Sequence, residues 1–484
     1  MSDLFYEAVI GLEVHAELKT ASKIFCACST AFGAPPNTQC CPICTGHPGT
    51  LPTINRNAVE LAIRAGLALQ CEISRLSRTD RKHYFYPDLP KAYQISQNEF
   101  PLCKNGRLSF CREGNTKEIG IERIHIEEDA GKLIHEGDQT LIDFNRCGVP
   151  LIEIVSKPDL RSGAEAAAYL RTLRAILSRL GVSDCKMQEG SLRCDVNISL
   201  RERGSDAFGT RVEIKNINSF AFVEKAINYE ISRQTVLLGR GEVIGMETRR
   251  FDSTKGVTEL MRTKESAEDY RYLPEPDLLA IKLSEVEIQE IEESLPELPA
   301  AQAARLVEAY GIRQKDADFL ASETELASFF EATAQATGFP QIALHLLLTD
   351  LMPHCTSEPF SSPVPWERIA ELADLLGEGE INSSTGKKLL ARLIKEDFSP
   401  ADTVAKEGLA QIRDADRLQT LVENAIQKMP QAVNDWLKGK TAAMRSLQGK
   451  IMAESSGRAD PMLAERLLLA SLEELKKQWE DSKA

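Results

Sequence analysis

The sequence predicts an α+β protein in which a mainly antiparallel sheet forms a cradle with flanking helices, followed by an all-helical C-terminal region. Two observations predict this class. Up to about residue 290, short segments alternate apolar and polar side chains between turn residues, the pattern of half-buried strands. Beyond the proline-bearing segment 294–300, an Ala-, Leu- and Glu-rich helical periodicity replaces this alternation and continues to the C-terminus.

The three clearest predicted strands each carry apolar side chains on one face and polar side chains on the other. Their apolar residues are Leu12, Val14, Ala16, Leu18, Cys194, Val196, Ile198, Leu200, Val212 and Ile214. Their polar residues are Glu13, His15, Glu17, Arg193, Asp195, Asn197, Ser199, Arg211, Glu213 and Lys215. Antiparallel sheets of this kind bury one face and leave the other accessible to water. The accessible face is therefore expected to be rich in possible ligands.

The clearest predicted helix covers residues 162–180. Ser162 and Glu165 form a capping-box pattern at its start, and Gly181 is a typical C-terminal stop. Its apolar face is formed by Leu170, Leu173, Leu177 and Leu180.

A chain of 484 residues is too long for one compact core, so several domains are expected. We place one boundary near residue 293 and a softer one near residue 408. These boundaries predict a cradle domain over 1–293, a helical domain over 294–407 and a C-terminal helical tail domain over 408–484.

The composition indicates a soluble, cytoplasmic protein without a membrane-spanning segment, because the chain has no long apolar run and no secretory start. The chain has 72 acidic and 58 basic residues, a formal net charge of −14. Any contact with nucleic acid must therefore come from a local basic face.

Four of the twelve cysteines lie in two close pairs, Cys26-x-Cys28 and Cys41-x-x-Cys44, with a glycine and prolines between the pairs. Paired thiolates that meet across a turn can complete a tetrahedral structural zinc site. In a reducing compartment such pairs bind metal more often than they form disulfides. Buried reduced thiols and redox chemistry are the alternatives, and the adjacent Cys40 has no assigned role.

Carboxylates gather in three predicted strands. Glu13 and His15 share one strand face, two residues apart, so both can reach one ion. The other acidic positions are Glu127, Glu128 and Asp129 in one segment and Glu153 in an otherwise apolar run. Hard oxygen ligands with one imidazole suit Mg²⁺ or Mn²⁺. Solvated or salt-bridged strand carboxylates are the structural alternative.

Residues 79–97 combine cations with aromatic rings. Arg81, Lys82 and Lys91 alternate with Tyr84, Phe85, Tyr86 and Tyr93. Cations beside metal ligands suit phosphoryl transfer, and aromatic rings beside cations suit stacking on a nucleotide or RNA base. A rigid surface loop with cation–π contacts is the alternative. No glycine-rich Walker loop occurs, so any use of ATP would rely on the carboxylate-lined sheet.

Eight motifs in order resemble the B-subunit family of the aspartyl/glutamyl-tRNA amidotransferases, almost from end to end of the chain. The motifs are G-L-E-V-H-A-E-L, C-x-C…C-P-x-C-T-G-H-P-G, D-R-K-H-Y-F-Y-P-D-L-P-K-A-Y-Q-I-S-Q, H-I-E-E-D-A-G-K, F-N-R-C-G-V-P-L-I-E-I-V-S, E-G-S-L-R-C-D-V-N-I-S, E-I-K-N-I-N-S-F and, at 269–278, D-Y-R-Y-L-P-E-P-D-L.

The resemblance implies a kinase and transamidase with a cradle of the glutamine synthetase type. In that family ATP phosphorylates the side-chain carboxylate of Glu-tRNA(Gln) or Asp-tRNA(Asn), and ammonia then displaces the phosphate. The ammonia comes from glutamine hydrolysed on the amidase, which is the A subunit. The small C subunit makes the complex a heterotrimer. ATP, Mg²⁺ (or Mn²⁺) and Zn²⁺ are the implied cofactors.

The resemblance also implies roles for individual residues of this chain. The implied magnesium ligands are Glu13, His15, Glu128 and Glu153, and the implied zinc ligands are Cys26, Cys28, Cys41 and Cys44. Lys82 and Lys91 match positions expected to contact phosphate, and Asp195 one expected to handle ammonia or metal. The implied tRNA-binding residues are Lys438, Lys440, Arg445, Lys450 and Arg458.

Three competing interpretations stand beside this one. The E subunit of archaeal type has an extra inserted domain, for which this sequence has no room before the helical region. A noncatalytic, zinc-pinned tRNA-binding scaffold would use its carboxylates only structurally. A free-standing metal hydrolase would be active without tRNA or partner subunits.

Overall fold

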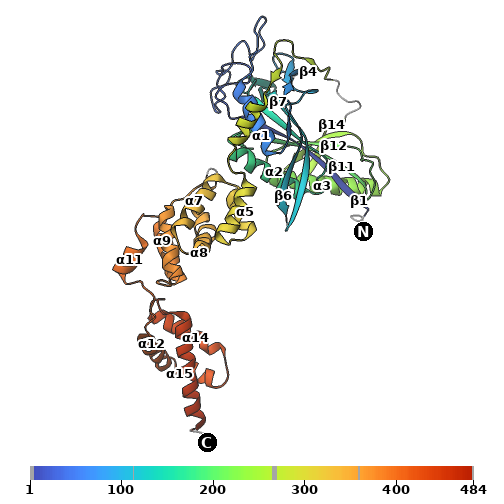
Figure 1. The fold of residues 1–484 in the computed structure, drawn as a ribbon. Coiled ribbons are helices and arrows are strands. Elements are labelled where there is room, and N and C mark those ends of the chain that lie inside the picture. The colour runs from blue at the N-terminus through green and yellow to red at the C-terminus, as the bar shows by residue number, and fades with distance from the viewer. Residues whose placement is uncertain (1–4, 113, 264–269, 358–359, 482–484) are drawn as a thin grey trace. The chain divides into compact units, whose positions relative to one another are not determined.

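The computed structural model describes residues 5–112, 114–263, 270–357 and 360–481, so Asp269, the first residue of the last family motif, lies outside the described residues. The chain divides into two compact units, residues 1–301 and 302–484 (Figure 1). Each unit is described by itself.

A nine-stranded sheet forms the centre of the first unit. Its strand order is β14 (Val257–Thr263), β13 (Glu247–Asp252), β12 (Val212–Ile217), β11 (Leu192–Glu202), β1 (Tyr6–Glu17), β10 (Pro150–Ser156), β7 (Asn115–Glu128), β6 (Cys103–Arg112) and β2 (Glu72–Ile73). Neighbouring strands are antiparallel except for β12 and β13, which pair in parallel. The predicted mainly antiparallel sheet is confirmed.

The alternation predicted for β1 is present in the structure. Leu12, Val14 and Ala16 are buried at 0–1% exposure, whereas the intervening Glu13, His15 and Glu17 are half-buried. The same holds for β11, where Cys194, Val196 and Ile198 point into the core. From Leu12 to Glu17, β1 therefore separates an apolar face from a polar face.

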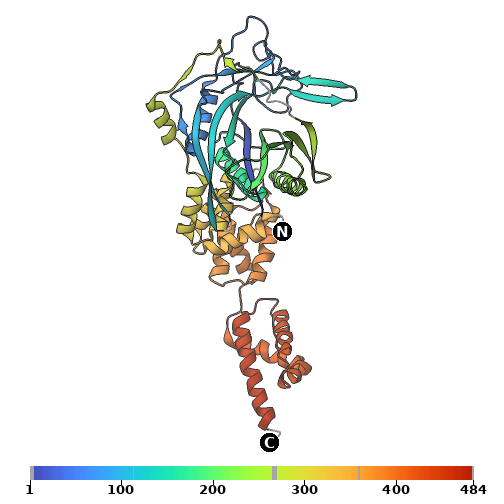
Figure 2. The same ribbon diagram turned by 90° about the vertical axis from the view of Figure 1, so that its right-hand side faces the viewer.

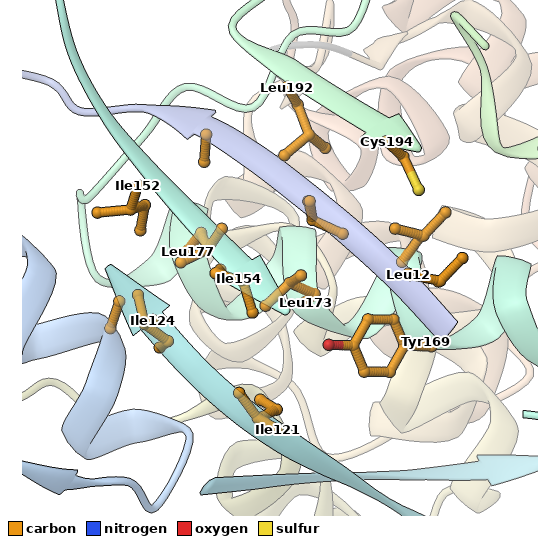
Figure 3. Packing of buried hydrophobic residues seen from close by; sticks show 14 of the residues in the cluster. Leu12, Ile121, Ile124, Ile152, Ile154, Tyr169, Leu173, Leu177, Leu192 and Cys194 are labelled. Atoms are coloured by element: carbon orange, nitrogen blue, oxygen red, sulfur yellow. The ribbon is translucent and has the colours of Figure 1, made fainter. Parts of the chain in front are cut away.

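Three helices cover the apolar face: α1 (Arg56–Ala68), α2 (Gly163–Arg179) and α3 (Phe220–Gly239). Tyr169, Leu173 and Leu177 of α2 pack against Leu12, Ile124, Ile154 and their neighbours on β1, β7 and β10 (Figure 3). Burial of this apolar surface contributes about 25 cal/mol per Å² to folding.

Helix α2 begins and ends close to where the sequence predicts. The Ser162 side chain accepts a hydrogen bond from the Glu165 backbone N–H, and Gly181 has a φ of +66°, the left-handed conformation of a helix stop. The carboxylate of Glu165 accepts from the Arg161 backbone N–H at 2.8 Å, one residue earlier than a reciprocal capping box would require.

Smaller sheets accompany the nine-stranded sheet in the first unit. β4 (Asp80–His83) pairs with β5 (Tyr93–Ser96) and β15 (Leu273–Pro274), and β3 (Leu76–Ser77) pairs with β16 (Ile281–Lys282). β8 (Lys132–Glu136) and β9 (Gln139–Asp143) form a separate hairpin. Helix α4 (Glu285–Glu293) follows β16 in the first unit (Figure 2). It begins with a capping box at Ser284.

The second unit is helical apart from a small hairpin of β17 (Thr356–Ser357) and β18 (Phe360–Ser361). Its helices are α5 (Pro299–Tyr310, across the boundary between units), α6 (Gln314–Ala321), α7 (Thr324–Ala336), α8 (Pro340–His345), the π-helix η2 (Leu346–Leu351), the 3₁₀-helix η3 (Met352–His354), α9 (Trp366–Gly377), α10 (Ser383–Leu393), α11 (Pro400–Glu407), α12 (Ala415–Lys428), α13 (Pro430–Leu437), α14 (Ala442–Glu454) and α15 (Pro461–Asp481). The predicted helical C-terminal region is confirmed.

The buried residues of the second unit form two hydrophobic clusters, one between residues 303 and 404 and one between 412 and 472. The sequence boundary near residue 408 lies between them, and the division of the chain into three domains stays a prediction. Among the described residues, no helix combines the length and the apolar character needed to span a bilayer.

Shortening one side chain of the central strand β1 tests the role of the apolar face. We expect Leu12→Ala to destabilise the first unit by about 2–5 kcal/mol, because the lost side chain leaves a cavity under β1. Leu279→Ala is the matched control, since Leu279 is 92% exposed and Leu12 is 1% exposed. Hydrogen exchange of the β11 amides should accelerate only in Leu12→Ala, and equal protection in both variants would contradict the assignment of this face as core.

Candidate active site

The polar face of the sheet brings together ionisable side chains from four neighbouring strands. The register pairs His15 of β1 with Glu153 of β10, and Glu153 with His125 of β7. On the other side of β1, Glu13 pairs with Asp195 of β11. Because side chains repeat with a period of two along a strand, these residues all point to the same side of the sheet.

Two histidines and two glutamates form a compact cluster. His15 Nε2 lies 3.5 Å from Glu153 Oε2 and 3.6 Å from Glu127 Oε1. His125 Nε2 lies 3.2 Å from the same Glu153 oxygen. Ligand atoms of His15, Glu127 and Glu153 lie within 4.8 Å of one another, close enough to hold one ion.

Opposite charges fix the protonation of this cluster. Burial alone would lower the pKa of His125, but Glu153 raises it to about 9, and Glu153 likewise raises the pKa of His15. Burial would raise the pKa of Glu153, but the two imidazoles hold it well below its ordinary value. The two imidazoles thus favour the carboxylate form of Glu153.

A second acidic group lies beside the first. Carboxylate oxygens of Glu13, Asp195 and Glu213 come within 4.8 Å of one another. Lys215 Nζ binds Asp195 and lies 2.9 Å from Glu213 Oε1, and the Asn197 amide donates to Glu13 Oε1 at 2.9 Å. Burial, followed by the neighbouring Glu153 carboxylate, raises the pKa of Glu13. A cation at Glu13 would relieve both effects.

Three consecutive acids at the end of β7 contact three different partners. Glu127 lies beside His15, whereas the buried Glu128 pairs with Lys91 and accepts from the Ile95 backbone N–H at 2.9 Å. Asp129 accepts from Arg193 Nη2 at 2.6 Å. In this structure, therefore, Glu127 supplies the carboxylate next to His15 and Glu128 lies outside that group.

Lys82 of β4 extends toward the cluster from the adjacent small sheet. Its Nζ lies 4.8 Å from the centre of the Tyr270 ring, and within the described residues it makes no hydrogen bond or ion pair. Burial would lower the pKa of Lys82, but the carboxylates of Glu127 and Glu153 are among the groups that raise it. Lys82 is thus a cation close to the acidic cluster.

The four cysteines of the two pairs meet in space, as the sequence predicts. The sulfur atoms of Cys26, Cys28, Cys41 and Cys44 lie within 4.8 Å of one another. A hydrogen bond from Cys26 lowers the pKa of Cys44 to about 4, and the Cys41 backbone N–H acts in the same direction. Four soft donors in this arrangement fit a tetrahedral zinc ion.

Cys40 lies outside this sulfur group, and its thiol instead donates to the Asn37 carbonyl oxygen at 3.3 Å. Lys23 is fully buried, and its ammonium donates to Cys44 Sγ at 3.6 Å and to the Phe144 carbonyl at 3.2 Å. A buried cation beside these sulfurs favours a thiolate form of the group, which is the form that binds metal.

A cavity of about 100 Å³ lies between the cysteine group and the Lys91–Glu128 pair, and Cys26, Cys44, Lys91 and Glu128 all line it. A Cβ atom on Gly46 would come within 2.4 Å of Lys91 Cγ, and Gly46 has a φ of +71°. Only glycine fits this position. The loop after Cys44 therefore packs directly on the Lys91 side chain.

The five basic residues predicted to bind tRNA belong to the last helical cluster of the second unit. Lys440 Nζ lies 3.1 Å from Asp435 Oδ1, and Lys450 Nζ lies 3.4 Å from Glu454 Oε1. The Arg458 guanidinium donates to backbone carbonyls. Lys438 and Arg445 are exposed, and their side chains make no hydrogen bond or ion pair within the described part of the chain.

Several site residues were not singled out from the sequence. His125 completes the imidazole–carboxylate cluster, and Lys215 and Glu213 flank Asp195. The two-residue alternation H-I-E at 125–127 was the available signal, because it places His125 and Glu127 on one strand face.

Comparisons with known proteins place most of the chain in described domain families. Residues 8–289 match the GatB/GatE catalytic domain, and residues 328–472 match the GatB domain. The first match covers the nine-stranded sheet except for Tyr6 and Glu7 at the start of β1, and it assigns this sheet to the GatB/GatE class of catalytic domains.

Similar full-length proteins narrow this class. The chain is 50% identical to the B subunit of the aspartyl/glutamyl-tRNA(Asn/Gln) amidotransferase from Caldanaerobacter subterraneus subsp. tengcongensis, over 96% of this chain and 99% of that protein. It is 48% identical to the B subunit from Thermoanaerobacter pseudethanolicus, over 96% of this chain and 99% of that protein. It is 47% identical to the B subunit from Clostridium botulinum (strain Alaska E43), over 97% of this chain and 99% of that protein. The chain belongs to the B-subunit family of the tRNA-dependent amidotransferases, which are multi-subunit ligases of protein biosynthesis. The resemblance is confirmed.

The Lys91–Glu128 pair provides a test of the site's electrostatics. Lys91 is 9% and Glu128 1% exposed, so we expect Glu128→Gln to destabilise the first unit by about 3–5 kcal/mol by leaving a buried ammonium unpaired. Glu259→Gln removes a carboxylate whose partners Arg250 and Lys255 are exposed, and should cost less than about 1 kcal/mol. Thermal unfolding of the isolated chain measures both.

Adding Lys91→Met to Glu128→Gln removes the uncompensated charge as well. The double variant should regain part of the lost stability, and a further loss instead would show that the two side chains do not act as a pair.

Proposed function

We propose that this chain is the kinase and transamidase subunit that converts Glu-tRNA(Gln) to Gln-tRNA(Gln), Asp-tRNA(Asn) to Asn-tRNA(Asn), or both. The cluster of His15, Glu127 and Glu153, with Lys82 beside it, carries the proposal because it combines a divalent-cation site with a free cation. Phosphoryl transfer requires both kinds of positive charge around the transferred group.

The proposed reaction has two steps. A carboxylate oxygen of the aminoacyl side chain bonds to the γ-phosphorus of ATP, and the bond to ADP breaks. The nitrogen of ammonia then bonds to the acyl carbon, inorganic phosphate leaves, and a proton is released as the amide forms. We place the ammonia source in glutamine hydrolysis on the A subunit, which is an amidase. The small C subunit would make the complex a heterotrimer in the cytoplasm.

We assign the hard-cation site to Glu13, His15 and Glu153, with Glu127 or Glu128 as a further ligand. Glu127 is favoured by its position next to His15, and Glu128 by the family resemblance. The donor set of carboxylates with an imidazole suits Mg²⁺ or Mn²⁺. When bound, the ion would neutralise the phosphate oxygens of ATP.

Three further side chains have proposed roles. Lys82, which makes no ion pair in the described structure, would contact the transferred phosphoryl group. Lys91 would contact phosphate if it exchanged its Glu128 partner for the substrate. Asp195, held by Lys215, would orient ammonia or accept the proton it releases.

The proposal also gives a structural role to the four cysteines and a tRNA-binding role to the C-terminal tail domain. The sulfur group of Cys26, Cys28, Cys41 and Cys44 would hold Zn²⁺ and fix the segment that packs on Lys91. The tail domain over 408–484 would contact tRNA through Lys438, Lys440, Arg445, Lys450 and Arg458, with residues 294–407 as the intervening helical domain.

Removing one central carboxylate tests the kinase assignment. In the complex assembled with the A and C subunits, we expect Glu153→Gln to lower amidation of both mischarged tRNAs by at least about 100-fold, because the charge that fixes the cation and the imidazoles is lost. Glu259→Gln on the exposed edge of the sheet is the control. ATP turnover that remains unchanged in Glu153→Gln would leave the noncatalytic scaffold as the better description.

The same assay tests the free-standing hydrolase, which wild-type activity without tRNA or partner subunits would indicate.

Mn²⁺ binding, followed by electron paramagnetic resonance, decides between the two neighbouring acids at the end of β7. Glu127→Gln should weaken this binding about 10- to 100-fold, and a larger loss in Glu128→Gln would favour the ligand implied by the resemblance.

The cysteine group is tested by its metal content. We expect purified wild-type protein to contain one zinc per chain and Cys41→Ser to lose it, with a lower thermal midpoint and weaker tRNA-dependent amidation. Cys111→Ser, which alters an exposed thiol outside the group, should retain zinc. Complete loss of ATP turnover in a well-folded, zinc-free Cys41→Ser protein would contradict a purely structural role.

A further inference from the structure

Four tyrosine rings form a continuous row beside the acidic cluster, which we call the tyrosine row: Tyr86, Tyr84, Tyr270 and Tyr272. Neighbouring ring centres are 5.7, 6.4 and 6.2 Å apart along this order, and the first two rings are stacked. The rings come from two distant segments, which the His83 N–H joins by donating to the Tyr270 carbonyl at 2.9 Å. The pairing of β4 with β15 continues this connection.

One part of the row reaches the polar face. Lys82 Nζ lies over the Tyr270 ring at 4.8 Å, and Lys82 interacts electrostatically with Tyr272, Glu127 and Glu153. The row thus extends from the connection after β4 to the only described lysine near the cluster that makes no hydrogen bond or ion pair. A cation next to aromatic faces is the combination that binds a nucleotide, since the rings take the base and the cation takes a phosphate.

The terminal rings of the row remain accessible. Tyr86 is 49% and Tyr272 39% exposed. Packing between the rings explains the two inner tyrosines, but it leaves large apolar surfaces of the outer two in water. Phe100 provides a contrast, because it is also 39% exposed but has the Arg78 guanidinium 4.5 Å above its ring. The accessible area of the tyrosine row is therefore available for a ligand.

We propose that the tyrosine row is a stacking site for an adenine nucleoside that carries phosphate. This inference rests on the proposed function, under which two such groups must approach the acidic cluster: the adenosine of ATP and the 3′-terminal adenosine of the aminoacyl-tRNA. Either one would stack its base on an outer tyrosine and place phosphate toward Lys82. The chemistry recognised is the same, so the two sources are separated by experiment.

Substitution of Tyr86 tests the proposal in the complex assembled with the A and C subunits. We expect Tyr86→Leu to raise the KM for one substrate, ATP or mischarged tRNA, by about tenfold, with kcat within about twofold of wild type, because a stacking surface for binding is lost. Tyr86→Phe keeps the ring and should restore the wild-type KM. Phe100→Leu is the matched control and should change neither constant.

The substrate whose KM rises identifies the source of the adenosine. Unchanged KM values for both ATP and tRNA in Tyr86→Leu and in Tyr272→Leu would overturn the proposal. An equal defect in Tyr86→Phe and Tyr86→Leu would also overturn it, because the hydroxyl rather than the ring would then be recognised. Failure of the proposed function is distinguishable, since the wild-type complex itself would then amidate neither tRNA.

Tyr86→Trp supplies a direct binding measurement if a kinetic variant proves unstable. The three tryptophans of the chain, Trp366, Trp436 and Trp479, all lie in the second unit, so a new indole in the first unit gives a separate signal. Its fluorescence should be quenched by ATP or by an uncharged tRNA, whichever source binds there. No quenching by either ligand at saturating concentration would overturn the stacking site.

Discussion

The register of β1 between β10 and β11 is the constraint on which the site depends. It aligns His15 with Glu153 and Glu13 with Asp195, and the period of two along each strand places all four side chains on one face. The opposite face holds Leu12 and the core beneath it. A slip of one residue in this register would bury the ionisable side chains and expose the apolar ones. The apolar packing that stabilises the sheet therefore also fixes which side chains face the candidate site.

Charge balance explains how so many acids share one face. Glu153 is ionised because two imidazoles flank it, while Lys215 binds Asp195 and Lys91 pairs with Glu128. Burying unpaired charges would cost several kcal/mol each, roughly, so these partners are required for folding before any substrate binds. The cluster around Glu13, whose pKa is raised, remains short of positive charge. A divalent cation bound there would supply the positive charge that this half of the face lacks.

Sequence reasoning located the strands and most of the site, but it could not choose between neighbouring side chains. Alternation placed Glu13, His15 and Asp195 on one face because each lies in the middle of a regular strand. At the end of β7, contacts with β5 come from a different part of the chain, and they draw Glu128 to Lys91 while Glu127 stays beside His15. The sequence pattern included Tyr84 and Tyr86, but it could not predict that Tyr270 and Tyr272 continue the row, since the two segments lie far apart in the sequence.

The cysteine group and the Lys91–Glu128 pair form one packed body, which explains why a structural metal site would belong so close to the chemistry. Gly46 leaves no room for a side chain against Lys91. A Cβ atom added to Gly148, whose φ is +81°, would lie 3.4 Å from Cys44 Cβ and 4.0 Å from Glu128 Oε2. Two glycines thus let the cysteine loops touch both members of the ion pair. Because protein interiors transmit strain through close packing, any loosening of the sulfur group must be felt by Lys91 and Glu128. The cysteine loops therefore fix the positions of Lys91 and Glu128 without contributing a ligand to the acidic cluster.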